Sequence, residues 1–99
     1  MMFKEIDAEE LRERMSKGDN ILLLDVRTDE EHEAENIPGS VHIPLHELEE
    51  RIDELEQFRD RQIIIYCRSG NRSAQACMYL QLVGFEDLVN LRGGMMYWN

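Results

Sequence analysis

The stretch IIIYCRSGNRSAQACMYL, residues 63–80, decides the fold because two different periodicities meet in it. It begins with a run of β-branched residues without polar alternation, which predicts a strand buried on both faces, as in parallel sheets. It ends in a segment whose apolar residues, such as Ala76 and Leu80, recur at helical spacing. The loop between the two starts at Cys67. The stretch therefore predicts a strand, a loop and a helix that starts near Ser73, which is the building unit of an α/β fold.

The rest of the chain repeats this alternation of strand and helix. NILLLDV, residues 20–26, predicts a second strand that is buried on both faces, and shorter strands are predicted at residues 3–6, 41–45 and 86–91. Helices are predicted in four places: residues 8–17 after an N-cap at Asp7, a short helix within residues 27–36, about three turns over residues 45–55, and residues 73–83 before Gly84. The order and the short connections predict a mostly parallel sheet with helices on both faces.

Length and charge limit the class of protein. The 99 residues predict a single domain, residues 1–99, that can bury a core without disulfides or metal. The formal net charge of -10 argues against nucleic acid or an anionic membrane as a partner, because both attract basic surfaces. No apolar run approaches the length of a membrane span, and the N-terminus has no secretory-signal pattern. These features predict a cytoplasmic protein with reduced thiols.

The loop after Cys67 has the composition of an anion-binding cradle. In open α/β sheets ligands bind beyond the carboxyl ends of the strands, and Cys67 stands at that end of a strand predicted to be central. A loop that curls there and enters a helix directs several backbone N–H groups at one point, and Gly70 allows such a curl. Side chains add positive charge and hydroxyl donors: Arg68, Arg72, Ser69 and Ser73.

Two interpretations of Cys67 are open at this point. Cysteine is among the most frequently buried residue types, so Cys67 taken alone is better explained by packing. A cysteine held by N–H groups and cations, in contrast, has a pKa of about 3.5–7.5 instead of about 8.5, and its thiolate is a nucleophile. The combination of strand end, cysteine, glycine, two arginines and helix favours the nucleophile. Cys77, about one turn inside the helix, is predicted to be a core residue, and the three histidines are predicted to lie on the surface or in loops.

Three blocks of the sequence resemble the rhodanese family of sulfurtransferases. LLLDVRTDEEHEAENIPGSVHIPL, residues 22–45, resembles the family's Asp-x-Arg signature, and residues 63–85 resemble its active-site region. NLRGGMMYW, residues 90–98, resembles its Gly-Gly…Trp ending. The resemblance covers nearly the whole chain and implies a three-layer α/β/α rhodanese-like domain with a mostly parallel central sheet of about five strands.

The resemblance implies a ping-pong sulfurtransferase in which Cys67 is the catalytic residue. Cys67 takes a sulfane sulfur from a small anionic donor such as thiosulfate, holds it as a persulfide and passes it to cyanide or a thiol. The donor is bound by the loop residues Arg68, Ser69, Gly70, Asn71, Arg72 and Ser73. Supporting roles fall to Asp25, Arg27 and Glu31, with Arg27 expected to pair with Glu31. No metal and no cofactor are implied, and a protein thiol or a cysteine desulfurase is a further candidate partner.

Two other functions compete with this hypothesis. One is a sulfur-carrier or interaction module that receives persulfide sulfur from a protein partner and reacts poorly with thiosulfate. The other is an anion-reducing or phosphatase-like enzyme, which the loop length disfavours. Cysteine phosphatases place five residues between cysteine and arginine, whereas four separate Cys67 from Arg72. The shorter ring suits one sulfur atom better than a phosphoryl group.

The sequence departs from the family pattern at two places. Asn36 stands where relatives commonly have a histidine before Ile-Pro-Gly, which removes an expected supporting hydrogen bond. The chain ends just after Trp98, so the last helix is expected to be short and Trp98 less buried than in longer relatives.

Arg68 occupies the position after the cysteine, where mercaptopyruvate-type relatives tend to have glycine. This residue favours an anionic inorganic donor or a persulfide donor.

Overall fold

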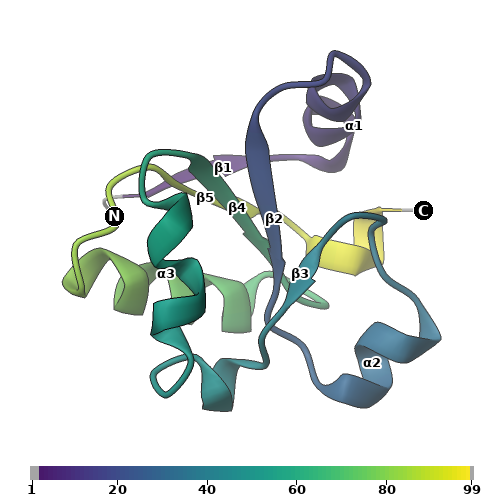
Figure 1. Cartoon of the computed structure of the whole chain (residues 1–99). Helices are drawn as coiled ribbons and strands as arrows, with labels where there is room; N and C mark the ends of the chain where they lie inside the picture. The colour runs from purple at the N-terminus through teal and green to yellow at the C-terminus, as the bar shows by residue number, and fades with distance from the viewer. Residues whose placement is uncertain (1–2, 99) are drawn as a thin grey trace.

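The computed structural model describes residues 3–98, which form an α/β fold around a five-stranded parallel sheet (Figure 1). The strand order is β1-β5-β4-β2-β3. The strands are β1 (Lys4–Ile6), β2 (Ile21–Asp25), β3 (Val41–His42), β4 (Gln62–Tyr66) and β5 (Leu88–Leu91). The α-helices are α1 (Ala8–Ser16), α2 (Asp29–Ala34) and α3 (Asn71–Leu82), and the 3₁₀ segments are η1 (Leu45–Glu47), η2 (Ile52–Phe58) and η3 (Gly94–Tyr97).

The two aliphatic runs predicted as doubly buried strands lie at the centre of the sheet. β4 pairs with β2 from Ile21↔Gln62 to Asp25↔Tyr66, and on its other side it pairs with β5. Four of the five residues of each run are buried, because helices cover both faces. The prediction that the strand before Cys67 is central is therefore confirmed, and its carboxyl end opens at the middle of the sheet edge.

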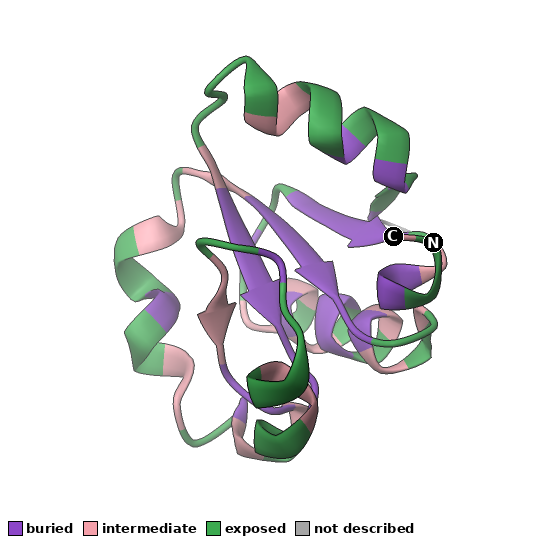
Figure 2. Ribbon diagram, turned by 90° about the vertical axis from the view of Figure 1, so that its right-hand side faces the viewer, coloured by how far each residue is buried: buried purple, intermediate pink, exposed green. Residues whose placement is uncertain are grey.

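The sheet is the middle one of three layers, as predicted. On one face Leu24 and Ile65 pack against α3, η1 and η2, with Leu80 as a fully buried contact from α3. On the other face Leu23 and Ile64 belong to a second core with α1 and η3. Figure 2 shows the buried strands between helices whose outer turns are exposed.

Local capping explains where two helices begin. The Asp7 carboxylate accepts a hydrogen bond from the Glu10 N–H at 2.8 Å, so the predicted N-cap of α1 is confirmed. α2 starts with a full capping box, in which Thr28 and Glu31 satisfy each other's backbone N–H groups. The sequence analysis predicted this short helix without identifying its cap.

Two predicted helices differ from the structure. Residues 45–55 do not form one three-turn helix, because η1 and η2 are separate 3₁₀ segments joined by turns. Their hydrogen bonds run three residues back, as from Glu47 N to Pro44 O, and glutamates crowd the connection, which disfavours a longer α-helix. α3 begins at Asn71 rather than near Ser73, because Gly70 with φ of 107° already turns the chain into the helix.

The described C-terminal residues end in η3. Trp98 is half-buried, and the guanidinium of Arg12 lies 4.4 Å from the centre of its ring. η3 is a short final helix of four residues, Gly94–Tyr97, as expected, and the lower burial of Trp98 relative to longer relatives stays a prediction. Within residues 3–98, none of the helices combines the length and the apolar composition that a membrane crossing requires.

Candidate active site

The Cys67 sulfur lies inside the turn between β4 and α3. Its Sγ accepts hydrogen bonds from the N–H of Gly70 at 3.1 Å and of Ser73 at 3.4 Å, and the Ser73 hydroxyl oxygen lies 3.4 Å away. Only 1% of Cys67 is exposed. The positive φ of Gly70, 107°, is the conformation that lets the loop close around the sulfur. The loop thus directs backbone donors at a single buried atom.

This cradle changes the acidity of the thiol. Burial opposes ionisation, but hydrogen bonding with Ser73, together with the N–H groups of Gly70 and Ser69, holds the pKa of Cys67 below its ordinary value. Cys77 has the opposite environment, since burial raises its pKa to about 12. The two cysteines therefore differ as predicted: Cys77 is a fully buried core residue, whereas Cys67 has the surroundings of a thiolate.

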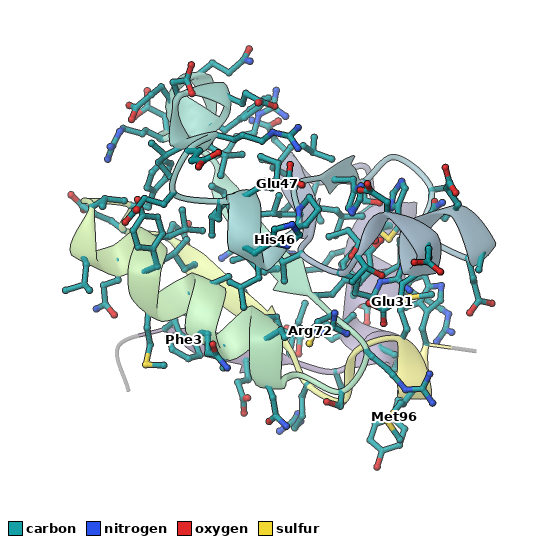
Figure 3. All side chains as sticks on the ribbon, turned by 90° about the horizontal axis from the view of Figure 1, so that it is seen from below. Phe3, Glu31, His46, Glu47, Arg72 and Met96 are labelled. Atoms are coloured by element: carbon teal, nitrogen blue, oxygen red, sulfur yellow. The ribbon has the colours of Figure 1, made fainter. Side chains whose placement is uncertain are left out.

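The two arginines of the loop behave differently. Arg72 forms two hydrogen bonds with Glu31 of α2, at 2.7 and 2.9 Å, and Figure 3 shows the two side chains next to each other. Within residues 3–98, no hydrogen bond or ion pair engages the side chain of Arg68, which is exposed. Arg68 is therefore the loop cation that is free to meet an anion.

The expected pairing of Arg27 with Glu31 is wrong. Arg27 binds Asp25 instead, with Nε to Oδ1 at 2.9 Å and Nη2 to Oδ2 at 2.8 Å, and the Arg27 N–H also donates to Oδ1. Asp25 is fully buried, so its charge needs a partner close by, and Arg27 is two residues away. Glu31 lies on α2 and faces Arg72.

A buried network continues from Asp25. Burial opposes its ionisation, but hydrogen bonds from Arg27 and from His32, at 2.8 Å, hold the pKa of Asp25 below its ordinary value. Arg27 Nη2 also donates to the Glu35 carbonyl at 2.6 Å, and the His32 ring stacks on the ring of His42. Asp25 and Arg27 thus fix the segment between β2 and β3. Their supporting role at the active site stays a prediction. His32 is a part of this network that the prediction of surface histidines missed.

Two surface pockets border the loop. One, of about 370 Å³, is lined by Arg27, Glu31, Arg68, Met95 and Met96. The other, of about 250 Å³, is lined by six residues, Val26, Thr28, Pro44, Leu45, His46 and Arg72. The Arg72–Glu31 pair therefore contributes one side chain to each pocket. The first pocket combines a free cation with two methionines of η3, and Figure 3 shows Met96 at the surface.

Most of the chain, residues 7–99, matches the family model described as Rhodanese-like domain. The chain belongs to the rhodanese-like domain family. A sulfurtransferase of Allochromatium vinosum is 42% identical over 97 residues, which cover 98% of this chain and 89% of that protein. YrkF of Bacillus subtilis, a proposed sulfur carrier protein, is 39% identical over 94 residues, or 95% of this chain and 50% of that protein. A rhodanese-like protein from Staphylococcus aureus superposes with a TM-score of 0.90 at 32% identity, covering 98% and 92% of the two chains.

The predicted loop residues of this rhodanese-like domain fall into two groups. Gly70 and Ser73 face the sulfur, whereas Arg68, Ser69 and Asn71 are exposed at the rim. Among the rim residues, Ser69 lowers the pKa of the thiol through its backbone N–H.

Two parts of the site were missed by sequence reasoning. Asn90 of β5 hydrogen-bonds with Ser73 and Gly70, and η3 caps the loop through N–H groups that donate to the carbonyls of Cys67 and Arg68 at 2.9 and 3.0 Å. A polar residue inside the apolar strand LVNL was the available signal for Asn90. Gly94 belongs to the Gly-Gly…Trp ending noted in the sequence, but its contact with the loop was not predicted: any Cβ there would lie 2.3 Å from the Cys67 carbonyl oxygen.

Proposed function

We propose that this rhodanese-like domain is a sulfurtransferase that carries a sulfane sulfur as a persulfide on Cys67. The observation that carries the proposal is the convergence of the Gly70 and Ser73 N–H groups on the Cys67 sulfur. These donors favour the thiolate over the thiol, and the thiolate is the form that attacks a sulfur donor. The same donors favour a charged outer sulfur next to Sγ.

The proposed reaction has two displacement steps. In the first, the Cys67 thiolate attacks the outer sulfur of thiosulfate, a new S–S bond forms, and sulfite leaves with the electron pair of the broken bond. In the second, cyanide or a thiolate attacks the outer sulfur, the S–S bond breaks, and its electron pair returns to Cys67 as thiolate. The products are thiocyanate or a persulfide of the acceptor. No external oxidant or reductant is required, because the sulfane sulfur moves between two nucleophiles.

Arg68 supports an anionic donor. Its side chain is exposed and lines the pocket of about 370 Å³ beside the loop, where a sulfonate-like group would gain a charge-assisted contact. Because Cys67 is only 1% exposed, the donor reaches Sγ when side chains at the rim of the loop move aside. Arg68, Ser69 and Asn71 are the exposed residues of this rim.

A second candidate function is that of a sulfur carrier loaded by another protein, such as a cysteine desulfurase. The similarity to YrkF, a proposed sulfur carrier, favours it. Both functions use the same persulfide and differ in the donor. A phosphatase-like reaction is disfavoured, because Arg72 is held by Glu31 and Asp25 is held by Arg27, which leaves neither for a phosphate or its leaving group.

Mass spectrometry of the intact protein tests the proposal. Incubation with thiosulfate is expected to add the mass of one sulfur atom, which dithiothreitol removes. Cys67→Ser is expected to gain nothing, and Cys77→Ala, the matched control that removes the other thiol, is expected to load like the wild type. Loading by a cysteine desulfurase with cysteine, but not by thiosulfate, would establish the carrier function instead. Absence of loading from both donors, or turnover of an aryl phosphate, would overturn the proposal.

A further inference from the structure

The side chain of Asn90 is a buried polar group next to the loop. It lies on β5, which neighbours β4, and all four residues of that strand are buried. Asn90 is 2% exposed, so its amide must be satisfied by protein partners. Its Oδ1 accepts from the Ser73 hydroxyl at 2.5 Å, and its Nδ2 donates to the Gly70 carbonyl at 3.2 Å and to a Glu5 carboxylate oxygen at 3.4 Å.

The chemistry of these partners fixes the orientation of the amide. The Gly70 carbonyl and the Glu5 carboxylate can only accept, so the NH₂ group of Asn90 must face them and its oxygen must face Ser73. The Asn90 oxygen can only accept, so the Ser73 hydroxyl must be the donor in this contact and its single proton points to Asn90. The Ser73 oxygen lies 2.5 Å from Asn90 Oδ1 and 3.4 Å from Cys67 Sγ. The remaining hydrogen-bond donors to the sulfur are therefore the backbone N–H groups of Gly70 and Ser73.

The two residues whose N–H groups are in hydrogen-bond geometry with the sulfur, Gly70 and Ser73, are also the two loop residues that Asn90 binds. Gly70 precedes the first residue of α3, and Ser73 lies in its first turn. A rotation of either residue would turn its N–H away from Cys67. One side chain on a neighbouring strand thus holds both ends of the segment that forms the cradle.

We propose that Asn90 is a positioning residue that keeps the N–H groups of Gly70 and Ser73 directed at the Cys67 sulfur. Its role in catalysis rests on the proposed sulfur transfer, whereas its effect on the thiolate does not. Asn90 acts through the two loop residues, and its side chain has no hydrogen bond to Cys67 among residues 3–98.

The charged side chains near the Cys67 sulfur form no hydrogen bond with it among residues 3–98. Arg72 is paired with Glu31 of α2, and Arg68 is exposed at the rim. Glu5 of β1 approaches the site through its contact with Asn90. On the side of η3, the contacts to the loop are backbone N–H groups donated to carbonyls. No charged side chain among residues 3–98 hydrogen-bonds to Sγ, and Arg72 interacts with Cys67 only through its charge, so the orientation of the N–H groups contributes directly to how readily the thiolate forms.

The pH dependence of Cys67 alkylation measures this role directly. Asn90→Leu has a similar size and lacks all three hydrogen bonds. With iodoacetamide as the probe and adducts located by peptide mass spectrometry, the variant is expected to show its inflexion at higher pH and about tenfold slower labelling near pH 6, which corresponds to one pKa unit. Val89→Ala is the matched control, because Val89 is the adjacent buried residue of β5 and belongs to the core on the opposite face. Val89→Ala is expected to lower the stability of the protein without shifting the pH dependence of Cys67 alkylation.

Cys77 reports on folding in the same experiment. It is fully buried, so its labelling in native buffer would reveal that a variant has opened. If Asn90→Leu opens in this way, Asn90→Ser replaces it, since serine keeps a polar group in a small volume but cannot reach both loop partners. The proposal would be overturned if the pH dependence of Cys67 alkylation were unchanged in a folded Asn90 variant, or if Val89→Ala shifted it by the same amount. The measurement needs no sulfur transfer, so a wild-type protein that fails to form a persulfide would contradict the proposed function alone.

Discussion

Glu31 and Arg72 are 41 residues apart in the chain, yet their side chains form two hydrogen bonds, at 2.7 and 2.9 Å. The pair joins the first turn of α2 to the first turn of α3 and so braces the loop that contains Cys67. It also determines which loop arginine can bind a ligand. Arg72 is held by the carboxylate, and Arg68 is left to face the pocket.

Replacing Glu31 with glutamine tests this brace through its pH dependence. Hydrogen bonding to Arg72, partly opposed by burial, lowers the pKa of Glu31 from 4.5 to about 2. A lowered folded-state pKa gives stability that is present above the unfolded value and is lost as pH falls through the folded value. The Glu31 side chain is 28% exposed, so solvent weakens the interaction. We therefore expect the free energy of unfolding of the wild type to exceed that of Glu31→Gln by only about 1 kcal/mol at pH 6. Urea unfolding should show this difference shrinking between about pH 5 and pH 2.

Glutamine keeps an acceptor for the capping box of α2, so the variant removes the charge and one hydrogen bond from Arg72 but leaves the helix cap in place. A difference in unfolding free energy that stays constant from pH 6 to pH 3 would contradict the assignment of the brace to the ionised carboxylate.

Arg27→Lys is expected to be strongly destabilising. Lysine cannot reproduce the forked contact with Asp25 and also reach the Glu35 carbonyl, so a buried carboxylate would lose part of its compensation. We expect a loss of about 3 kcal/mol in urea unfolding at neutral pH. Arg51→Lys, at an exposed pair with Glu54, is the matched control and should change stability by less than about 0.5 kcal/mol. Equal effects of the two changes would show that the Asp25 pair is not a structural element.

The two cysteines are expected to separate stability from sulfur loading. Cys77→Ala removes a fully buried sulfur from the core and should cost about 1 kcal/mol while leaving persulfide formation unchanged. Cys67→Ala should abolish loading and change the free energy of unfolding little. Intact-mass measurement after thiosulfate treatment and urea unfolding give the two readouts. Loss of sulfur loading in a folded Cys77→Ala variant would identify Cys77 as a resolving thiol and would contradict its assignment as a core residue.

Gly94→Ala is expected to disturb the loop from the side of η3. The added Cβ would lie 2.3 Å from the Cys67 carbonyl oxygen and 2.7 Å from that of Arg68, so η3 must move away from the loop. We expect at least about 2 kcal/mol of destabilisation and slower sulfur loading. Gly39→Ala is the control, because Gly39 also has a positive φ but nothing lies within 4 Å of its Cβ position. It should show the backbone cost, about 1 kcal/mol, without the loading defect.

Arg68→Ala is expected to weaken the use of an anionic donor. Loss of one charge-assisted contact should raise the thiosulfate concentration for half-maximal loading by about tenfold, with little change in the transfer from a preformed persulfide to cyanide. Arg68→Lys should recover part of the loss at low ionic strength. A donor-independent defect in both steps would place Arg68 in the chemistry of transfer rather than in donor binding.

Local patterns predicted the elements that form through short-range contacts. The runs in β2 and β4 are aliphatic without alternation, and both strands are central and buried as predicted. The N-cap at Asp7 was also predictable from the sequence, because its hydrogen-bond partner, the N–H of Glu10, is three residues away. The segment 45–58 misled the prediction, because apolar residues spaced for an α-helix bury the same face when the chain runs through two 3₁₀ segments.

The sequence by itself determined the unit of strand, loop and helix around Cys67, and it distinguished this cysteine from Cys77, since both depend on neighbours along the chain. Only the tertiary structure decided which distant groups complete the cradle. Asn90 lies 17 residues from Ser73, and Glu31 lies 41 residues from Arg72. These contacts follow from the order and register of the parallel strands, which side-chain periodicity does not encode.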